Sequence, residues 1–209
     1  AISALHAAGL HDEVDAWAAR HAPARDARAL YRLLDKGLNC PRTSSLGRWF
    51  DAAAGLLGVR DANLYEGQAA MELESLAAQR GAVPPLPDGW RLAGSTLDLL
   101  PLLTALLHET DPAHGAALFH STLAAALADW ARTVAALQPG EALLLAGGCA
   151  LNQVLASQLR QHLHTHHIGL IQAHLAPPND GGIALGQAWV ARHAYKEMSN
   201  VSRDTGAGR

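Results

Sequence analysis

Apolar residues recur at intervals of three or four along the first two thirds of the chain, and this spacing predicts a succession of amphipathic helices. The expected helices cover residues 3–20, 25–36, 46–57, 66–80, 96–109 and 112–137. Glycine and proline mark the breaks between them, and the proline-rich tract 81–89 predicts a loop. We interpret this loop as a surface connection, because the helices on either side are too short to form two independent cores.

The pattern changes in the last third, where short apolar runs alternate with helical segments. Strands are expected at 142–146 and 169–174, separated by a helix over 151–163. A second helix is expected at 183–194, and the polar residues 196–209 predict a disordered tail. This strand–helix–strand–helix order favours a parallel pair of strands, so the predicted fold class is a helix-rich α/β fold.

Composition sets limits on the class of protein. The chain has 209 residues, of which 49% are hydrophobic and 17% charged, so it has ample material for a core and does not match a disordered protein. A net charge of −3 predicts no nucleic-acid partner. No apolar run reaches the length of about 18 residues that a membrane span needs. Cys40 and Cys149 are too few for a disulfide framework, and we expect reduced thiols and a cytoplasmic location.

Two glycine-containing loops follow the predicted strands. Gly147 and Gly148 lie between a strand and a helix, where backbone amides can bind an anion or a nucleotide, although such glycines also serve as simple turns. Asp180 follows the next strand and could hold a hard cation or a metal bound to phosphate. The alternative for Asp180 is a helix-capping or turn-forming residue.

Two further helix starts carry polar residues suited to a ligand. Thr43–Asp51 combines hydroxyls, a glycine and an arginine, which suits sugar or phosphate contacts, and the alternative is a capped helix with a solvated charged side. Glu66 precedes another helix, where an acidic residue satisfies the helix dipole without any function.

Histidine and cysteine give weaker indications. His162 and His166 are one helical turn apart, as metal ligands can be, but histidines near a helix end are also favourable without a metal. Cys149 lies near a helix start, where a thiol can become nucleophilic, yet a small packing residue is the preferred interpretation.

Four segments together resemble the HypF family, the carbamoyltransferases of [NiFe]-hydrogenase maturation. They are TSSLGRWFDAAAGLLG, YEGQAAMELE, LAGGCALNQVLASQL and PPNDGGIALGQA, in the family's order and with family-like spacing. Phe119-His120 in the long helix also matches the family's pattern, and the resemblance runs from about residue 3 to residue 194. It implies the second lobe of a TsaD-like domain, which belongs to the actin/hexokinase-type ATPase folds.

The resemblance also implies a reaction. Carbamoyl phosphate and ATP would form carbamoyl adenylate, and the carbamoyl group would pass to the C-terminal cysteine of HypE, for the synthesis of cyanide ligands. The implied site residues fall into three groups. Lining the nucleotide are Gly147, Gly148 and Asn152. Facing its ribose and phosphates, or near the same cleft, are Ser45, Gly47, Arg48, Asp51, Glu66 and Gly67. Asp180 would complete a site for a divalent metal, whether iron, zinc or magnesium.

Several segments of the family pattern have no counterpart in this sequence. No segment matches the histidine pair of the first lobe that supplies the other metal ligands, nor the acylphosphatase, zinc-finger and YrdC-like portions. We therefore expect residues 1–40 to be leading helices that join a missing first lobe, and residues 41–195 to be the nucleotide-binding second lobe. The chain would then be a fragment, inactive by itself. The alternatives are a small-molecule O-carbamoyltransferase and a non-catalytic nucleotide-binding lobe. A TsaD-type role on tRNA is the least favoured.

Overall fold

The computed structural model describes the backbone of residues 1–21 and 24–204 and the side chains of residues 1–21 and 26–195. The first two thirds are mainly helical, with α1 (Ile2–Ala7), α2 (Glu13–His21), α3 (Ala24–Asp35), α4 (Leu46–Leu56), α5 (Gln68–Arg80), α6 (Leu100–Leu107) and α7 (Pro112–Thr133). The last third contains β3 (Ala142–Leu145), α8 (Gln153–His164), β4 (Gly169–Gln172) and α9 (Ile183–Asp204). These elements confirm the predicted helix-rich α/β fold.

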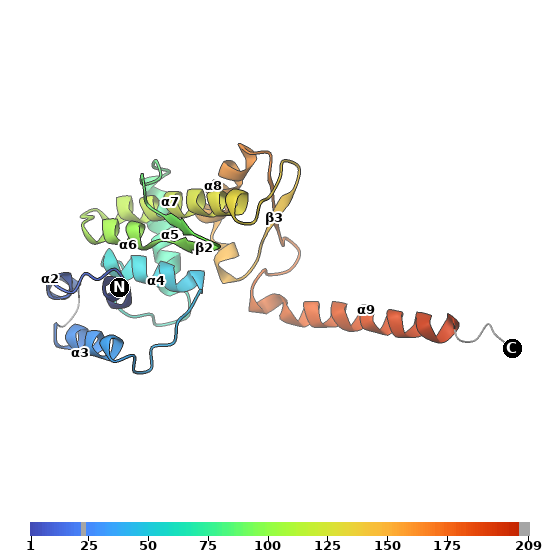
Figure 1. The fold of residues 1–209 in the computed structure, drawn as a ribbon, viewed down its shortest axis with the longest axis horizontal. Helices are drawn as coiled ribbons and strands as arrows, with labels where there is room; N and C mark the ends of the chain where they lie inside the picture. The colour runs from blue at the N-terminus through green and yellow to red at the C-terminus, as the bar shows by residue number, and fades with distance from the viewer. Residues whose placement is uncertain (22–23, 205–209) are drawn as a thin grey trace.

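Helix α7 is the centre of the core and packs against both α5 and α8 (Figure 1). It begins where the sequence predicts, because Pro112 suits the first helical position and the Asp111 side chain accepts a hydrogen bond from the Ala113 amide. Its buried alanines allow close approach of the neighbouring helices. Phe119 of α7 meets Phe50 of α4 edge to face, with ring centroids 4.9 Å apart.

The predicted first helix is two helices in the structure. Gly9 has a positive φ of 71°, which ends α1, and the chain turns before α2 begins at Glu13. Leu5 and Trp17 are buried in the same hydrophobic cluster as the later helices, and the Trp17 indole donates to the Gly55 carbonyl over 3.2 Å. The division of the chain at residue 40 stays a prediction.

A short hairpin replaces the start of the helix predicted over 96–109. Strands β1 (Arg91–Ala93) and β2 (Thr96–Asp98) pair antiparallel. The Asp98 carboxylate then accepts from the Leu100 amide over 2.9 Å, at the start of α6. Strands of three residues are too short to show a periodic pattern, so the hairpin cannot be predicted from apolar spacing.

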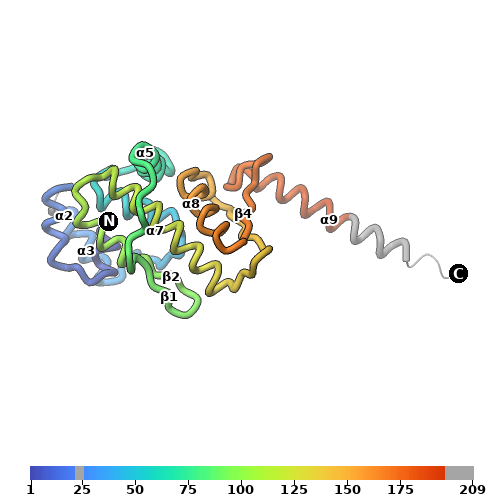
Figure 2. The backbone as a smooth tube through the Cα atoms, turned by 90° about the horizontal axis from the view of Figure 1, so that it is seen from above, coloured from blue at the N-terminus to red at the C-terminus, as the bar shows by residue number. Residues whose placement is uncertain are grey.

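The parallel pair of strands is confirmed, with α8 as its crossover helix. Ala142 lies opposite Gly169 and Leu145 opposite Gln172, so the carboxyl ends of β3 and β4 meet at one edge. Helix α9 then leads away from the rest of the molecule (Figures 1 and 2). It runs past the predicted end at residue 194 and takes in residues 196–204 of the predicted disordered tail. Residues 205–209 of that tail lie outside the described residues.

Neither of the two 22-residue helices, α7 and α9, has the sustained hydrophobicity of a bilayer-crossing segment, nor does any other helix among residues 1–21 and 24–204.

Candidate functional site

The two glycine-containing loops of the last third are joined directly. The Gly147 amide, just beyond β3, donates a hydrogen bond of 2.7 Å to the Pro178 carbonyl, in the loop beyond β4. Parallel strands bring their carboxyl ends to the same edge of a sheet, which is where ligands bind in open α/β folds. The topology therefore places Gly147, Gly148 and the Asp180 loop together, as the sequence analysis expected of one site.

Gly147 and Gly148 differ in their backbone conformation. Gly147 has φ 92° and ψ 177°, a conformation that only glycine adopts readily. Gly148 has no such constraint, and a Cβ placed on either residue would meet nothing within 4 Å. Both glycines thus present backbone to open space, directly before the short 3-10 helix η1 (Gly148–Leu151). Open space beside exposed backbone is what a ligand approaching the main chain requires.

Asn152 is placed differently from its two partners in the motif. Its side chain is only 6% exposed and caps α8, with Oδ1 accepting from the Leu155 amide over 2.8 Å. Its amide nitrogen Nδ2 lies 3.0 Å from Nε2 of His120. Both ends of the side chain are therefore engaged inside the protein. The expectation that Asn152 lines the nucleotide stays a prediction.

His120, from the middle of α7, is the buried partner that the sequence analysis gave no role. Its Nδ1 lies 2.7 Å from the Ala116 carbonyl, which can only accept, so Nδ1 carries the proton. Nε2 is then the acceptor for the Asn152 amide. Burial lowers the pKa of His120 to about 4, so the ring is neutral at pH 7. Only the Phe119-His120 pair in a family-like segment pointed to this residue.

The first turns of α4 lie beside residues 147–153, which we call the glycine segment. Arg48 and Asp51 form an ion pair at 2.8 Å, and α4 contacts η1. Burial, and then the Asp51 carboxylate, raises the pKa of the Cys149 thiol, while Arg48 lowers it by a smaller amount. The structure therefore brings Arg48 and Asp51 to the glycine segment as expected. It also favours a protonated Cys149, in line with a packing role.

Ser45 and Gly47 lie at the start of the same helix. Ser45 is the exposed N-cap residue of α4, but its hydroxyl makes no capping hydrogen bond, and its amide donates to Thr43 Oγ1 over 3.0 Å. A Cβ on Gly47 would meet only the Ser45 hydroxyl, at 3.7 Å. This helix start is thus open enough for the predicted ligand contacts.

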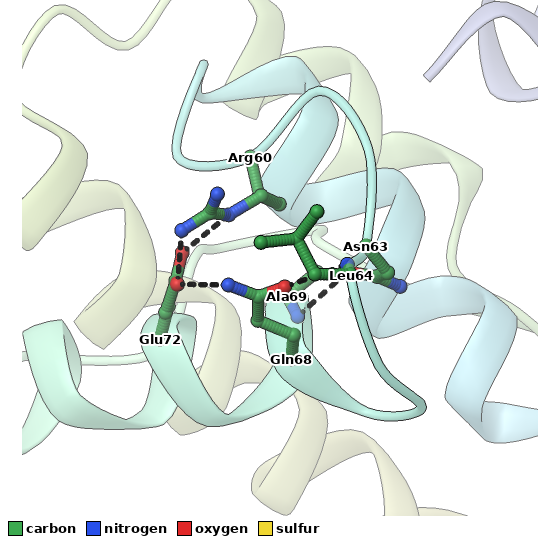
Figure 3. A network of polar contacts seen from close by, with 6 residues as sticks. All are labelled: Arg60, Asn63, Leu64, Gln68, Ala69 and Glu72. Carbon is green, nitrogen blue, oxygen red and sulfur yellow. Dashed lines mark hydrogen bonds and ion pairs between the residues drawn. The ribbon is translucent and has the colours of Figure 1, made fainter.

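Glu66 and Gly67 come directly before Gln68, which is part of a separate polar network at the start of α5 (Figure 3). Gly67 has φ 78° and precedes α5, and Glu66 is exposed. The network forms around Gln68, whose Oε1 accepts from the Leu64 amide over 2.8 Å while its Nε2 donates to Glu72 over 3.0 Å. No hydrogen bond or ion pair within the described ranges connects Glu66 or Gly67 to the glycine segment. Their role near a nucleotide stays a prediction.

The network is completed by two contacts that fix the loop before α5. Arg60 donates to the Glu72 carboxylate through two of its nitrogens, one of them Nε at 2.9 Å. The Asn63 side chain accepts from the Ala69 amide over 3.0 Å. Figure 3 shows the loop folded over the first turn of α5 by these side chains.

Asp180 has too few neighbouring ligands among the described side chains to form a metal centre. It is exposed and opens the 3-10 helix η2 (Asp180–Gly182), capped by the Asn179 side chain. Among the described side chains, residues 1–21 and 26–195, no three of His, Cys, Asp or Glu gather where one ion could bind. The described residues therefore do not fit a complete metal site. Burial, followed by the neighbouring His166, lowers the pKa of His162, but these two histidines have no third ligand.

Comparison with protein families matches residues 1–187 to the second subdomain of the Kae1-like domain of carbamoyltransferases, in its HypF form. The chain belongs to the HypF carbamoyltransferase family. This match confirms the predicted resemblance and the predicted fold, one lobe of a larger ATPase-type domain.

Individual HypF proteins give the same result. Carbamoyltransferase HypF2 of Cupriavidus necator is 44% identical over 218 residues, covering 91% of this chain and 27% of that protein. HypF of Rhizobium leguminosarum bv. viciae is 42% identical over 193 residues, covering 91% of this chain and 25% of that protein. A crystal structure of full-length HypF in a phosphate- and nucleotide-bound form matches with a TM-score of 0.72 and 28% identity, covering 92% of this chain and 26% of that one. The chain thus spans about a quarter of the length of these HypF proteins.

HypF membership gives a context for the apolar surface of the last third. Leu144 of β3 is 68% exposed and Ile171 of β4 is 54% exposed, on the face of the sheet opposite α8. Helix α9 adds further exposed apolar residues: Ile183, Leu185, Trp189 and Val190. An exposed apolar surface of this kind is typical of a site of contact with another protein segment.

Proposed function

We propose that this chain is the nucleotide-binding lobe of a HypF-type carbamoyltransferase, acting in the cytoplasm. The complete enzyme forms carbamoyl adenylate from ATP and carbamoyl phosphate and passes the carbamoyl group to the C-terminal cysteine of HypE. The observation that carries the proposal is the edge of the β3–β4 sheet. There, two loops joined by the Gly147–Pro178 hydrogen bond present Gly148 to open space.

The side chains around this edge suit a nucleotide. The Arg48 guanidinium is 64% exposed beside the glycine segment and can bind phosphate oxygens, since its partner Asp51 leaves part of the fork free. The hydroxyl of Ser45 and the backbone of Gly47 lie at the same helix start and suit ribose or phosphate contacts. Asp180, at the second loop, would supply one oxygen ligand to a divalent metal such as iron, zinc or magnesium, whose other ligands come from outside this chain.

A first lobe is the partner that completes the site. We propose that the exposed apolar residues of β3, β4 and α9 face it, and that residues 1–40 lead from it into the lobe formed by residues 41–195. Only half of a cleft is then present in this chain. Stabilising the charge of a carbamoyl adenylate takes groups from both sides.

A chimera tests the proposal directly. The matching segment of Cupriavidus necator HypF2 is replaced by this chain, and pyrophosphate release is measured with ATP and carbamoyl phosphate. We expect turnover that depends on both substrates, and carbamoylation of HypE rather than of free sugars. A folded chimera without turnover overturns the proposal, and transfer to sugars alone moves the assignment to a small-molecule O-carbamoyltransferase.

Substitutions at the edge locate the site within the chimera. Gly148→Ala adds a Cβ that meets no protein atom, so it blocks a ligand without disturbing the fold. We expect it to weaken ATP binding by at least ~10-fold, equivalent to about 1.4 kcal/mol. Met71→Ala, on the exposed side of α5, is the matched control and should leave binding unchanged.

A further inference from the structure

The glycine segment, residues 147–153, is held by hydrogen bonds from four separate parts of the chain: the loop after β4, and the elements β4, α5 and α7. Beyond the Pro178 contact, the Gln172 side chain donates to the Ala150 carbonyl over 3.3 Å, and the Gln153 amide donates to Glu74 over 2.6 Å. The fourth contact, between Asn152 and His120, differs from the others because both residues are buried. A buried hydrogen bond has no water to replace it, so its loss is costly.

The Asn152–His120 contact has one stable arrangement. The Nδ1 proton of His120 is used by the Ala116 carbonyl, so Nε2 offers only a lone pair. Asn152 must then turn its NH2 group toward His120 and its oxygen toward the Leu155 amide. The reverse orientation would set the NH2 group against the Leu155 amide, donor against donor.

Aromatic packing holds the imidazole in this position. Its ring centroid is 5.5 Å from that of Phe50 and 5.7 Å from that of Phe119, and both contacts are edge to face. His120 has 0% exposure, so no solvent competes for Nε2. The ring is therefore a fixed acceptor that belongs to the core of α7 and reaches the residue directly after η1.

We propose that His120 is the positioning residue of the glycine segment: its unprotonated Nε2 orients Asn152, and Asn152 in turn fixes the conformation in which Gly147 and Gly148 face a nucleotide. That the glycines face a nucleotide rests on the proposed function. That His120 orients Asn152 and fixes the conformation of the segment is independent of it. His120 itself touches no ligand, and its effect on binding passes through Asn152.

Two substitutions of His120 separate positioning from packing. His120→Gln keeps an acceptor near the position of Nε2, whereas His120→Asn reaches only toward the Ala116 carbonyl. Both lose the imidazole ring. We expect His120→Asn to weaken ATP binding to the chimera by at least ~10-fold, and His120→Gln to stay within about 3-fold of the parent. Leu123→Ala, a buried residue of the same helix that lies outside this contact, controls for loss of stability alone.

Amide hydrogen exchange of the nucleotide-free 209-residue chain is the second readout. His120→Asn should speed exchange of the amides from Gly148 to Gln153 by at least ~10-fold more than His120→Gln does. Equal effects of the two variants, or effects that follow the loss of thermal stability as in Leu123→Ala, overturn the inference. If the exchange rates separate but the parent chimera binds no ATP, the proposed function fails and the positioning role stands.

A measurement on the unsubstituted chain covers the case in which the variants do not fold. Nitrogen-15 NMR of the imidazole distinguishes the two neutral tautomers. We expect the His120 proton on Nδ1, and a proton on Nε2 would overturn the inference because Nε2 could then not accept from Asn152.

Discussion

Single residues in the glycine segment have separate physical reasons for their identity. Gly147 is required by its backbone conformation, Gly148 leaves open space beside the backbone, and Asn152 caps a helix while contacting a buried histidine. The sequence alone does not separate these three reasons, because glycine and asparagine are also common in ordinary turns. Only the structure separates backbone strain, open space and buried polar contact.

The first prediction follows from the two glycines. Gly147→Ala forces alanine into φ 92° and should lower the free energy of unfolding by about 1–3 kcal/mol. Gly148→Ala should change it by less than ~0.5 kcal/mol, since the added methyl group meets no atom. Urea denaturation of the two variants checks the difference. Equal stability losses would contradict the assigned roles.

The second prediction concerns pH and His120. The folded pKa of about 4 lies below the ordinary value of 6.5, so the unfolded chain binds more protons between these values. Stability is therefore complete above pH 6.5 and falls as the pH drops toward 4. The free energy of unfolding that is lost when His120 becomes protonated is about 3 kcal/mol in order of magnitude.

Denaturation at a series of pH values checks this prediction, with His120→Gln as the comparison. Carboxylates such as Glu109, whose pKa is lowered mainly by the Asp111 amide, also lose stability in acid, but they are present in both proteins. The wild-type curve should fall more steeply between pH 6.5 and 4. Parallel curves would show that His120 does not resist protonation.

The third prediction concerns Cys149, whose pKa is raised by burial and by Asp51. A protonated thiol reacts slowly, so iodoacetamide should label it at pH 7 more slowly than a free cysteine, with the rate still rising above pH ~8.5. A Cys40→Ser background isolates the signal. Asp51→Asn should speed labelling, and rapid labelling at neutral pH would revive the nucleophile alternative.

At the scale of elements, the long segments were predictable and the short ones were not. Helix α7 and the parallel strands have strong patterns and clear proline or glycine boundaries. The break at Gly9 depends on a single positive φ, and the hairpin at 91–98 has strands too short for a period. The boundaries of α7 and α9 also shifted, since helix ends depend on local hydrogen bonds rather than on apolar spacing.

The fourth prediction tests the element boundary before α5. Gln68 is buried and links the Leu64 amide to Glu72. Gln68→Ala should leave the Leu64 amide without its acceptor, while Glu72 keeps Arg60 as a donor, and should lower stability by about 1–2 kcal/mol. Met71→Ala, at a half-exposed position of the same helix, should have little effect. Thermal unfolding of both variants checks this. Equal changes in the two would mean that the network around Gln68 does not hold the loop.

At the scale of the whole molecule, the sequence predicted which segments make up the candidate site, and the structure adds how these segments contact one another. The strand–helix–strand pattern was enough to bring Gly147 and Asp180 to one edge. The approach of Arg48 and Asp51 to Cys149, and of His120 to Asn152, joins segments far apart in the chain. Such contacts follow from helix packing, which no local pattern encodes. Glu66 and Gly67 were named by the resemblance alone, and their role near a nucleotide stays a prediction.

The hydrogen bond between Gly147 and Pro178 also couples the movements of the loops that follow β3 and β4. The proline ring fixes φ at Pro178, so one of the two backbone dihedrals of the accepting residue cannot rotate. Displacement of either loop must then be shared by the other. If a ligand binds at the first loop and an ion at the second, the binding of each would then change the affinity for the other. This holds even though the two loops carry separate sequence motifs.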